Sequence, residues 1–218
     1  MERNEIRIVI ADDHPIFRQG LRQAIERESD LKVLDEAADG LSALRLVESL
    51  RPDVAVLDIS MPGMDGFVLA ESMREKKLEV GIIFLTMYKE EAAFNRAMDM
   101  GVKGYILKDS AVSDIISCIR AVAGGQLYVS PTIASYVLSR SARSAALLDE
   151  RPGLKDLTPT ERRILKMIAD NKTSREIARE LFVSPRTIDN HRTNISQKLG
   201  LRGSHALLKF AYDHKSEL

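Results

Sequence analysis

The chain has 218 residues, of which 44% are hydrophobic and 29% are charged, and this composition suits one large globular domain or two small ones. Its single cysteine, Cys118, excludes a disulfide within the chain, and no apolar run approaches the ~20 residues that a membrane-spanning helix needs. The first residues are charged and show no pattern of a secretory signal, so we predict a cytoplasmic protein.

The charge is unevenly distributed, although Lys and Arg balance Asp and Glu over the whole chain. Residues 1–150 carry 18 Lys and Arg against 24 Asp and Glu, a net charge of −6. Residues 151–218 carry 14 Lys and Arg against 8 Asp and Glu, a net charge of +6. This asymmetry predicts that only the last part of the chain meets a polyanion such as nucleic acid.

Residues 1–125 alternate short apolar runs with stretches whose apolar residues recur at helical spacing. The runs are rich in β-branched residues, which is typical of strands covered on both faces. Five β-α units predict an α/β fold with a doubly wound, five-stranded parallel sheet. The predicted strands span residues 6–11, 32–37, 54–58, 81–86 and 104–107, and the predicted helices span 16–27, 42–50, 67–76, 91–100 and 112–123.

The pattern changes after residues 124–125, where two glycines end the last of these helices. We predict a partly helical linker over residues 126–153 and a separate domain over 154–218. In that domain Thr158 and Thr173 each precede a glutamate by three residues, and Ser184 precedes a proline, as at the starts of helices. With a fourth helix expected over residues 204–214, this domain is predicted to be all-α.

Polar side chains stand at the ends of four of the predicted strands. Asp12 and Asp13 follow the first strand, Asp58 ends the third, Thr86 ends the fourth and Lys108 follows the fifth. Because the carboxyl ends of parallel strands lie at one edge of the sheet, we expect these five side chains in one crevice. Crowded carboxylates repel one another, and a divalent cation relieves that repulsion. Carboxylate oxygens suit Mg²⁺, so the sequence predicts a magnesium site there.

The same residue types suit phosphoryl transfer. The Asp58 carboxylate can attack phosphorus and form an acyl phosphate. Mg²⁺ and the Lys108 ammonium would offset charge on the transferring group. The Thr86 hydroxyl can donate a hydrogen bond to a phosphoryl oxygen once that group is attached.

The motifs around these residues are similar to those of a known family. An Asp-Asp-His triplet at 12–14, the string LDISMPGMDG at 57–66, Leu-Thr at 85–86 and Gly-Tyr-Ile-Leu-Lys at 104–108 resemble the flavodoxin-like receiver domain of two-component response regulators. The resemblance covers about residues 5–123. It implies that residues 1–125 form a phosphoacceptor domain, with a partner histidine kinase or a small acyl phosphate as the phosphate donor.

The resemblance also implies a role for each residue of the crevice. Asp58 is the implied phosphoacceptor and forms the catalytic set with Thr86 and Lys108. Thr86 and Tyr105 are the implied switch residues. The implied Mg²⁺ ligands are Asp13, Asp58, the backbone carbonyl of Ser60 and, through water, Asp12.

Two bulky residues follow Thr86, where receivers generally favour a small one. We hypothesise that Met87 and Tyr88 shield the acyl phosphate from water, and the alternative is that both lie on a mobile loop. If the hypothesis holds, replacing both residues by Ala raises the rate of dephosphorylation.

The helix predicted to begin after Ser184 carries the DNA contacts. Ile188, Ile195 and Leu199 share one apolar stripe, so the other side chains lie largely on other faces. A helix fits the major groove, and its base-reading residues usually lie toward its N-terminal part. The residues predicted to contact DNA are Arg186, Thr187, Asp189, Asn190, Arg192, Thr193, Gln197 and Lys198.

These candidates divide by the part of DNA that they can reach. Arg186, Arg192 and Lys198 can reach phosphates, which supply affinity and register, whereas contacts to base edges supply specificity. Asn190 can pair with adenine, and Asp189 can accept a hydrogen bond from cytosine. The alternative for Asp189, which we favour slightly over base contact, is that it faces solvent or pairs with Arg186 or Arg192.

Residues 155–212 resemble the LuxR-type helix-turn-helix of the NarL/FixJ subgroup of response regulators. The matching positions include Leu157, Thr158, Glu161, Leu165, Glu176, Ile177, Ala178, Leu181, Ser184, Thr187, Ile188, Asn190, His191, Lys198, Leu199 and Gly200. The resemblance implies a bacterial transcription regulator that binds double-stranded promoter DNA as a dimer. The last helix resembles the dimerising helix of that family, and a plain core role suits its apolar face equally well.

These features predict a DNA-binding response regulator in which phosphorylation of Asp58 controls homodimerisation and promoter binding. Such a protein is not a conventional enzyme, although it catalyses its own Mg²⁺-dependent phosphorylation and slow dephosphorylation. The rival interpretation is an aspartate-nucleophile phosphohydrolase, but such an enzyme has a second acid two residues after its nucleophile, where Ser60 stands here. A third interpretation, a DNA-binding protein that ignores phosphorylation, conflicts with the intact acidic cluster.

Overall fold

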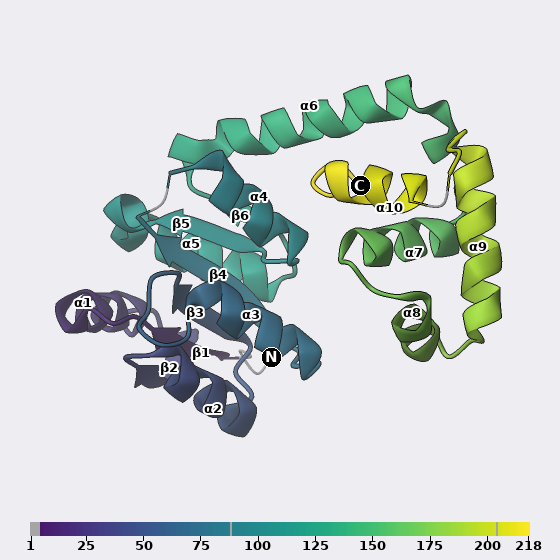
Figure 1. Ribbon diagram of the computed structural model, residues 1–218. Helices are drawn as coiled ribbons and strands as arrows, with labels where there is room; N and C mark the ends of the chain where they lie inside the picture. Colours follow the sequence, from purple (N-terminus) through teal and green to yellow (C-terminus); the bar gives the residue numbers. More distant parts are fainter. Residues whose placement is uncertain (1–4, 88, 204) are drawn as a thin grey trace. The chain divides into compact units, whose positions relative to one another are not determined.

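The computed structural model describes residues 5–87, 89–203 and 205–218 (Figure 1). The chain forms two compact units, Met1–Tyr136 and Val137–Leu218, and each unit has its own apolar core. Helix α6, Ala134–Glu150, begins in the first unit and ends in the second.

A parallel sheet with helices on both faces makes up the first unit. The strands lie in the order β2-β1-β3-β4-β5-β6, and each neighbouring pair is parallel. The strands are β1 (Ile6–Ala11), β2 (Leu31–Ala37), β3 (Val54–Asp58), β4 (Gly81–Thr86), β5 (Gly104–Leu107) and β6 (Tyr128–Val129). The helices are α1 (Pro15–Ile25), α2 (Gly40–Leu50), α3 (Gly66–Glu75), α4 (Glu91–Asp99) and α5 (Ala111–Ala123).

The ten elements predicted for this unit agree with the structure within about two residues at each end, but the predicted count of five strands is one too low. The sixth strand, β6, falls in the segment predicted to be a linker. The backbone N–H of Tyr128 donates to the carbonyl of Lys103 (2.8 Å), and the N–H of Ser130 donates to that of Tyr105 (3.0 Å). A strand of two residues is too short to show an alternating pattern, so only its pairing with β5 reveals it.

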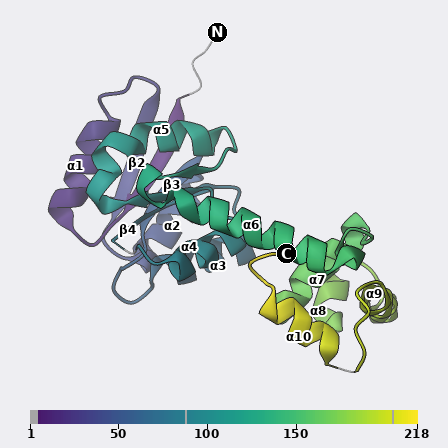
Figure 2. The ribbon, with the colours of Figure 1, turned by 90° about the horizontal axis from the view of Figure 1, so that it is seen from above.

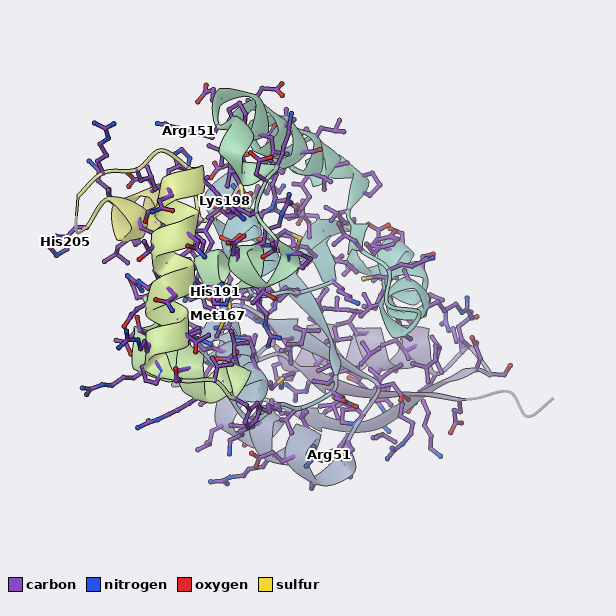
Figure 3. All side chains as sticks on the ribbon, turned by 90° about the vertical axis from the view of Figure 1, so that its right-hand side faces the viewer. Arg51, Arg151, Met167, His191, Lys198 and His205 are labelled. Carbon is purple, nitrogen blue, oxygen red and sulfur yellow. The ribbon has the colours of Figure 1, made fainter. Side chains whose placement is uncertain are left out.

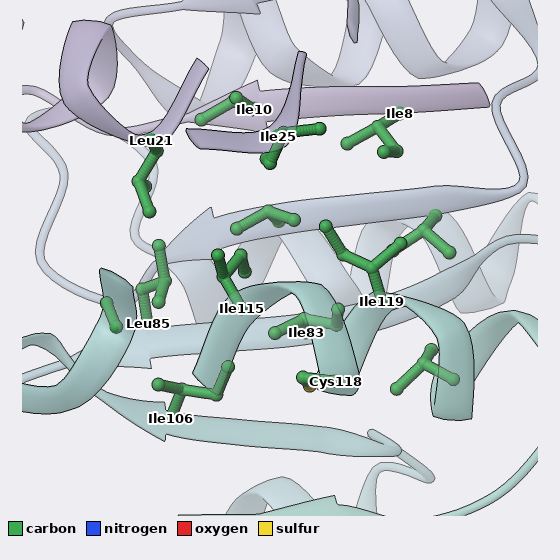
Figure 4. Packing of buried hydrophobic residues seen from close by; sticks show 14 of the residues in the cluster. Ile8, Ile10, Leu21, Ile25, Ile83, Leu85, Ile106, Ile115, Cys118 and Ile119 are labelled. Carbon is green, nitrogen blue, oxygen red and sulfur yellow. The ribbon is translucent and has the colours of Figure 1, made fainter. Parts of the chain in front are cut away.

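Helices α1 and α5 cover one face of the sheet, and α2, α3 and α4 cover the other (Figure 2). On the first face, branched aliphatic side chains from the strands interlock with those of the two helices (Figure 4). Cys118 of α5 is fully buried in this layer, and burial raises the pKa of its thiol. Cys118 therefore acts as a small apolar core residue rather than as a reactive thiol.

The opposite face of the sheet has an aromatic character. Successive residues of a strand point to opposite faces, so Phe84 and Tyr105 point away from the aliphatic layer. Phe84 packs edge-on against Phe67 of α3, with ring centroids 5.2 Å apart. Tyr105 packs edge-on against Phe94 of α4, with ring centroids 5.5 Å apart.

The second unit is helical. The end of α6 packs with α7 (Pro159–Ala169), α8 (Ser174–Leu181), α9 (Pro185–Lys198) and α10 (Ala206–Asp213) around one core. Thr158 and Thr173 form the predicted capping boxes with Glu161 and Glu176. The fourth predicted helix corresponds to α10, and Ser204, where we expected its start, lies outside the described residues.

A tight turn joins α8 to α9. Phe182 ends α8 in the left-handed conformation, with φ of 55°, and Ser184 caps α9 by accepting a hydrogen bond from the N–H of Thr187 (3.1 Å). Ile188 and Ile195 of α9 are fully buried. These contacts fix α9 through its apolar stripe and leave its other faces for solvent or a partner.

Helix α10 uses its apolar face within its own unit. Leu207, Phe210 and Ala211 are buried in the core, so a plain core role accounts for this face. None of the helices in the described part of the chain has the length and apolar character needed to cross a membrane.

Candidate functional site

The carboxyl ends of the strands bring the predicted crevice residues together. Asp12 follows β1, Asp58 ends β3 and Thr86 ends β4, and all three are at most 1% exposed. The loop after β3 approaches closely because residue 66 is glycine. A Cβ atom at Gly66 would lie 2.6 Å from the carbonyl oxygen of Asp58, so any larger residue there would displace the loop.

Lys108 lies between two of the carboxylates. Its Nζ is 2.7 Å from Oδ2 of Asp58 and 2.8 Å from Oδ2 of Asp12, and it stands 5.1 Å from the centre of the Phe17 ring. Burial lowers the pKa of Lys108, but the bonds and charges of Asp12 and Asp58 outweigh this and raise it. Lys108 is therefore an ammonium at neutral pH.

For Asp58, the effect of burial on the pKa is larger than the effect of its hydrogen bonds. Burial is the largest influence and raises its pKa, and the negative charge of Asp12 adds to this. The bonds from Lys108 and from the backbone N–H of Ser60, which lies 3.1 Å from Oδ1, act in the lowering direction but do not cancel the effect of burial. The net rise in pKa shows that this carboxylate lacks full compensation of its charge.

The crevice fits a hard divalent cation. Ligand atoms of Asp12, Asp13, His14 and Asp58 lie within 4.8 Å of one another. Asp12 Oδ2 and Asp13 Oδ1 are buried, and hydrogen bonds from the described residues leave both oxygens unsatisfied. Each oxygen has one ion-pair contact, with Lys108 at 2.8 Å and with the Nδ1 atom of His14 at 2.7 Å, and keeps a lone pair for a further ligand. Buried carboxylate oxygens with spare lone pairs are the donors that Mg²⁺ prefers.

The two predicted switch residues are in contact. Tyr105 is fully buried, and its hydroxyl is hydrogen-bonded to Thr86; burial raises the pKa of Tyr105 to about 12, against the opposing effect of that bond. Phe94, which packs on Tyr105, also packs on Tyr136 of α6, with ring centroids 5.9 Å apart. The Tyr136 hydroxyl donates to the carbonyl of Lys89 (2.5 Å). A series of side-chain contacts thus leads from the crevice to the start of α6.

The residues after Thr86 are only partly described. Met87 is 62% exposed, and Tyr88 lies outside the described residues. The hypothesis that both shield an acyl phosphate stays a prediction.

Most of the predicted DNA contacts lie on open faces of α9, from which side chains project outward (Figure 3). Arg186, Asp189, Asn190 and Gln197 are exposed, and within the described chain none of their side chains has a hydrogen bond or an ion pair. In particular, Asp189 pairs with neither arginine and faces solvent, so of the alternative for this residue the solvent-facing form is the one that this structure has. The other members of this face are Thr187 and Arg192, which are half-buried, and Thr193, whose hydroxyl donates to the carbonyl of Asp189.

Lys198 differs from the other candidates. Its Nζ lies 2.7 Å from Oε2 of the buried Glu161 and 3.1 Å from the carbonyl of Asp156. Burial acts to raise the pKa of Glu161, but the bonds from Lys198 and Thr158 outweigh it and lower that pKa. Lys198 thus joins the end of α9 to the start of α7, and this internal pairing argues against a phosphate contact.

Sequence reasoning missed two residues that support the crevice. Phe17 lies against Lys108, and Arg18 donates to the backbone carbonyl of Asp12 (2.5 Å). The sequence offered only one sign of this role, which is that both residues lie in the first turn of α1, directly after the Asp-Asp-His triplet.

The fold and the site together define a class of protein, a parallel α/β domain with an acidic crevice followed by a helix-turn-helix domain. A family model described as the response regulator receiver domain matches residues 8–120. A second model, described as bacterial regulatory proteins of the LuxR family, matches residues 155–211.

Curated relatives match both domains. The oxygen regulatory protein NreC of Staphylococcus carnosus is 34% identical over 96% of this chain and 98% of its own length. The nitrate/nitrite response regulator NarL of Escherichia coli K12 is 35% identical over 89% of both chains.

Solved structures are similar as well. The receiver domain of a putative response regulator NarL from Mycobacterium tuberculosis is 36% identical, with a TM-score of 0.55, and matches 56% of this chain and 99% of that one. RcsB of Salmonella enterica, bound to a promoter in the presence of a phosphomimetic, is 28% identical over 95% of this chain and 98% of that one, with a TM-score of 0.59.

The chain belongs to the family of two-component response regulators that carry a LuxR-type DNA-binding domain. The family consists of transcription regulators and not of conventional enzymes, so the phosphohydrolase interpretation is excluded.

Proposed function

We propose that transfer of a phosphoryl group to Asp58 controls homodimerisation and binding of promoter DNA, and that the donor is a partner histidine kinase or a small acyl phosphate. The observation that carries this proposal is the state of Asp58. Its carboxylate is buried at the edge of the sheet, 2.7 Å from the Lys108 ammonium, with a raised pKa that marks uncompensated charge. Perturbed, clustered carboxylates of this kind are typical of functional sites.

The residues present support a chemical role for each group. One Asp58 oxygen attacks phosphorus, a new P–O bond forms, and the bond to the donor breaks with its electron pair leaving on the donor. Lys108 holds a positive charge beside the incoming oxygens throughout. Asp12, Asp13, Asp58 and the Ser60 carbonyl are the proposed Mg²⁺ ligands, and the ion, when bound, offsets negative charge on the phosphoryl group.

The switch begins at Thr86. Its hydroxyl donates to a phosphoryl oxygen on Asp58, so its present bond to Tyr105 weakens. Tyr105 packs on Phe94, and Phe94 packs on Tyr136 of α6. The change therefore alters the surface around β4 and β5 and the start of the helix that continues into the second unit.

The output domain acts through α9. Its exposed residues Arg186, Asn190 and Gln197, with the half-buried Arg192, are the proposed contacts to phosphates and base edges. In this scheme residues 1–125 are the receiver, 126–153 the linker and 154–218 the DNA-binding domain, and action on promoters places the protein in the cytoplasm. Two half-site contacts in a dimer combine into one tighter interaction.

The test measures molecular mass and DNA affinity with and without beryllofluoride, which mimics the phosphoryl group. The DNA is a duplex selected with the purified protein from a random library, because the operator is unknown. We expect the activated protein to dimerise and to bind this duplex at least about tenfold more tightly. Equal mass and equal affinity in both states would leave a DNA-binding protein that ignores phosphorylation.

A further inference from the structure

The loop that carries Asp12 and Asp13 lacks the usual anchor at the start of a helix. His14 is the N-cap of α1, but its side chain accepts no hydrogen bond from the backbone of the helix. The carboxylates of Asp12 and Asp13 lie beside that of Asp58, and their mutual repulsion favours moving the loop away. Lys108 pairs with the side chains of Asp12 and Asp58, but a contact to the backbone must also hold the loop.

Arg18 supplies that contact. Its Nη1 donates to the carbonyl of Asp12 (2.5 Å), and its Nε donates to Oε2 of Glu36 on β2 (3.0 Å). The side chains of Arg18 and Glu36 are only 17% and 21% exposed. In addition, the N–H of Asp12 donates to the carbonyl of Ala37, the residue after Glu36 (3.1 Å). Strand β2 thus holds Asp12 at both of its backbone groups, once directly and once through Arg18.

We propose that Arg18 is a positioning residue for the magnesium site, which fixes the peptide between Asp12 and Asp13 and so directs both carboxylates toward the cation. The inference rests on the proposed function in taking Mg²⁺ as that cation. Arginine suits the task because its planar fork donates in two fixed directions. A lysine ammonium lacks that geometry and cannot hold Asp12 and Glu36 in the same way.

The proposal predicts an effect opposite in sign to that of simple electrostatics. Arg18 is a cation close to a cation site, so its charge alone repels Mg²⁺. Removing that charge would then tighten Mg²⁺ binding. Loss of a group that orients metal ligands instead weakens metal affinity by about 10- to 100-fold.

The chain contains a matched control in Arg22. Its Nη1 donates to the other oxygen of Glu36 (2.8 Å), and it lies one turn further along the same helix. Within the described residues the side chain of Arg22 pairs with Glu26 and Glu36 and forms no hydrogen bond or ion pair with Asp12. Arg18→Met and Arg22→Met therefore remove the same charge from the same carboxylate, but only Arg18→Met releases Asp12.

The experiment measures Mg²⁺ affinity by calorimetry on the full chain for the wild type, Arg18→Met, Arg22→Met and Arg18→Lys. We expect the Kd of Arg18→Met to rise about tenfold and that of Arg22→Met to stay within about twofold. Arg18→Lys, which keeps the charge and so protects the fold, is expected to weaken binding as well. Unchanged or tighter binding by both Arg18 variants would overturn the proposal, as would equal weakening by Arg22→Met.

A second measurement without metal separates this inference from the proposed function. The N–H of His14 donates to Oδ1 of Asp12 (2.8 Å), so its hydrogen exchange in EDTA reports on the loop directly. We expect faster exchange at this amide in Arg18→Met and wild-type exchange in Arg22→Met. A wild type that binds no Mg²⁺ overturns the proposed metal site, while unchanged exchange in Arg18→Met overturns the role of Arg18 in holding the loop.

Discussion

The acidic crevice and the outer face of α9 hold charged residues in opposite ways. In the crevice, side chains from four strands converge, and Lys108 contacts two buried carboxylates. On α9, Arg186, Asp189 and Asn190 come from one helix and are exposed, and their side chains have no hydrogen-bond or ion-pair partner within the described chain. In the crevice, opposite charges face one another within the protein and offset one another in part, whereas the helix face leaves its hydrogen-bonding groups for another molecule.

This difference gives a criterion for the role of a charged side chain. Lys108 and Lys198 both pair with buried carboxylates, but only Lys108 lies in a crevice whose carboxylates retain free lone pairs. The carboxylate of Glu161 accepts hydrogen bonds from Lys198 and from the backbone N–H of Thr158 within the protein. We therefore infer a chemical role for Lys108 and a structural role for Lys198.

The largest expected effect is loss of phosphorylation. Asp58→Asn removes the nucleophile while keeping the shape of the side chain, so no label is incorporated from a labelled small acyl phosphate. Asp53→Asn is the matched control, because Asp53 directly precedes the same strand at its other end. Label on Asp58→Asn at the wild-type rate would place the phosphoacceptor elsewhere.

The structural role inferred for Lys198 is tested by measuring the free energy of unfolding. Lys198→Met leaves the carboxylate of Glu161, 5% exposed, without its cation, and we expect the free energy of unfolding to fall by about 2 kcal/mol. This is below the 3–5 kcal/mol typical of fully buried pairs because the lysine is partly exposed. Lys172→Met, which breaks the more exposed pair with Glu180, is the control and is expected to cost less than about 1 kcal/mol. Equal losses in urea unfolding would contradict the distinction.

DNA binding tests the role proposed for the outer face of α9. Arg192→Ala is expected to weaken binding about fivefold on every sequence and to reduce the salt slope of log K by about 1, as for one lost phosphate contact. Lys198→Met, measured where it remains folded, is expected to leave the slope unchanged. A lower slope for Lys198→Met would show that its ion pair with Glu161 opens on DNA.

A smaller effect concerns the stability that the folded protein loses by burying the charged carboxylate of Asp58. The pKa of Asp58 is raised in the folded state, so the folded protein binds this proton more tightly than the unfolded chain does. Stability from this group is therefore lost as pH rises from the unfolded pKa to the folded one. Asp58→Asn lacks this loss, and we expect it to be more stable than the wild type by about 1 kcal/mol at neutral pH without Mg²⁺. The advantage should disappear below the unfolded pKa in thermal unfolding, and an advantage independent of pH would contradict this explanation.

The sequence by itself determined the elements and the residues at their ends. Buried parallel strands require continuous apolar runs, so Asp12, Asp58 and Lys108 stand out where those runs stop. The capping boxes at Thr158 and Thr173 are equally local, because cap and glutamate are three residues apart. Features of this kind depend on periodicity and short spacing, which the chain displays directly.

Only the tertiary structure decided which groups have partners. Strand β6 exists through its bonds to β5, and Lys198 reaches Glu161 across 37 positions of sequence. Arg18 reaches Glu36 and the backbone of Asp12 because α1 packs beside β2. The physical reason is that a charged side chain near a motif looks the same in sequence whether it faces solvent or a buried carboxylate, and packing between distant segments makes that choice.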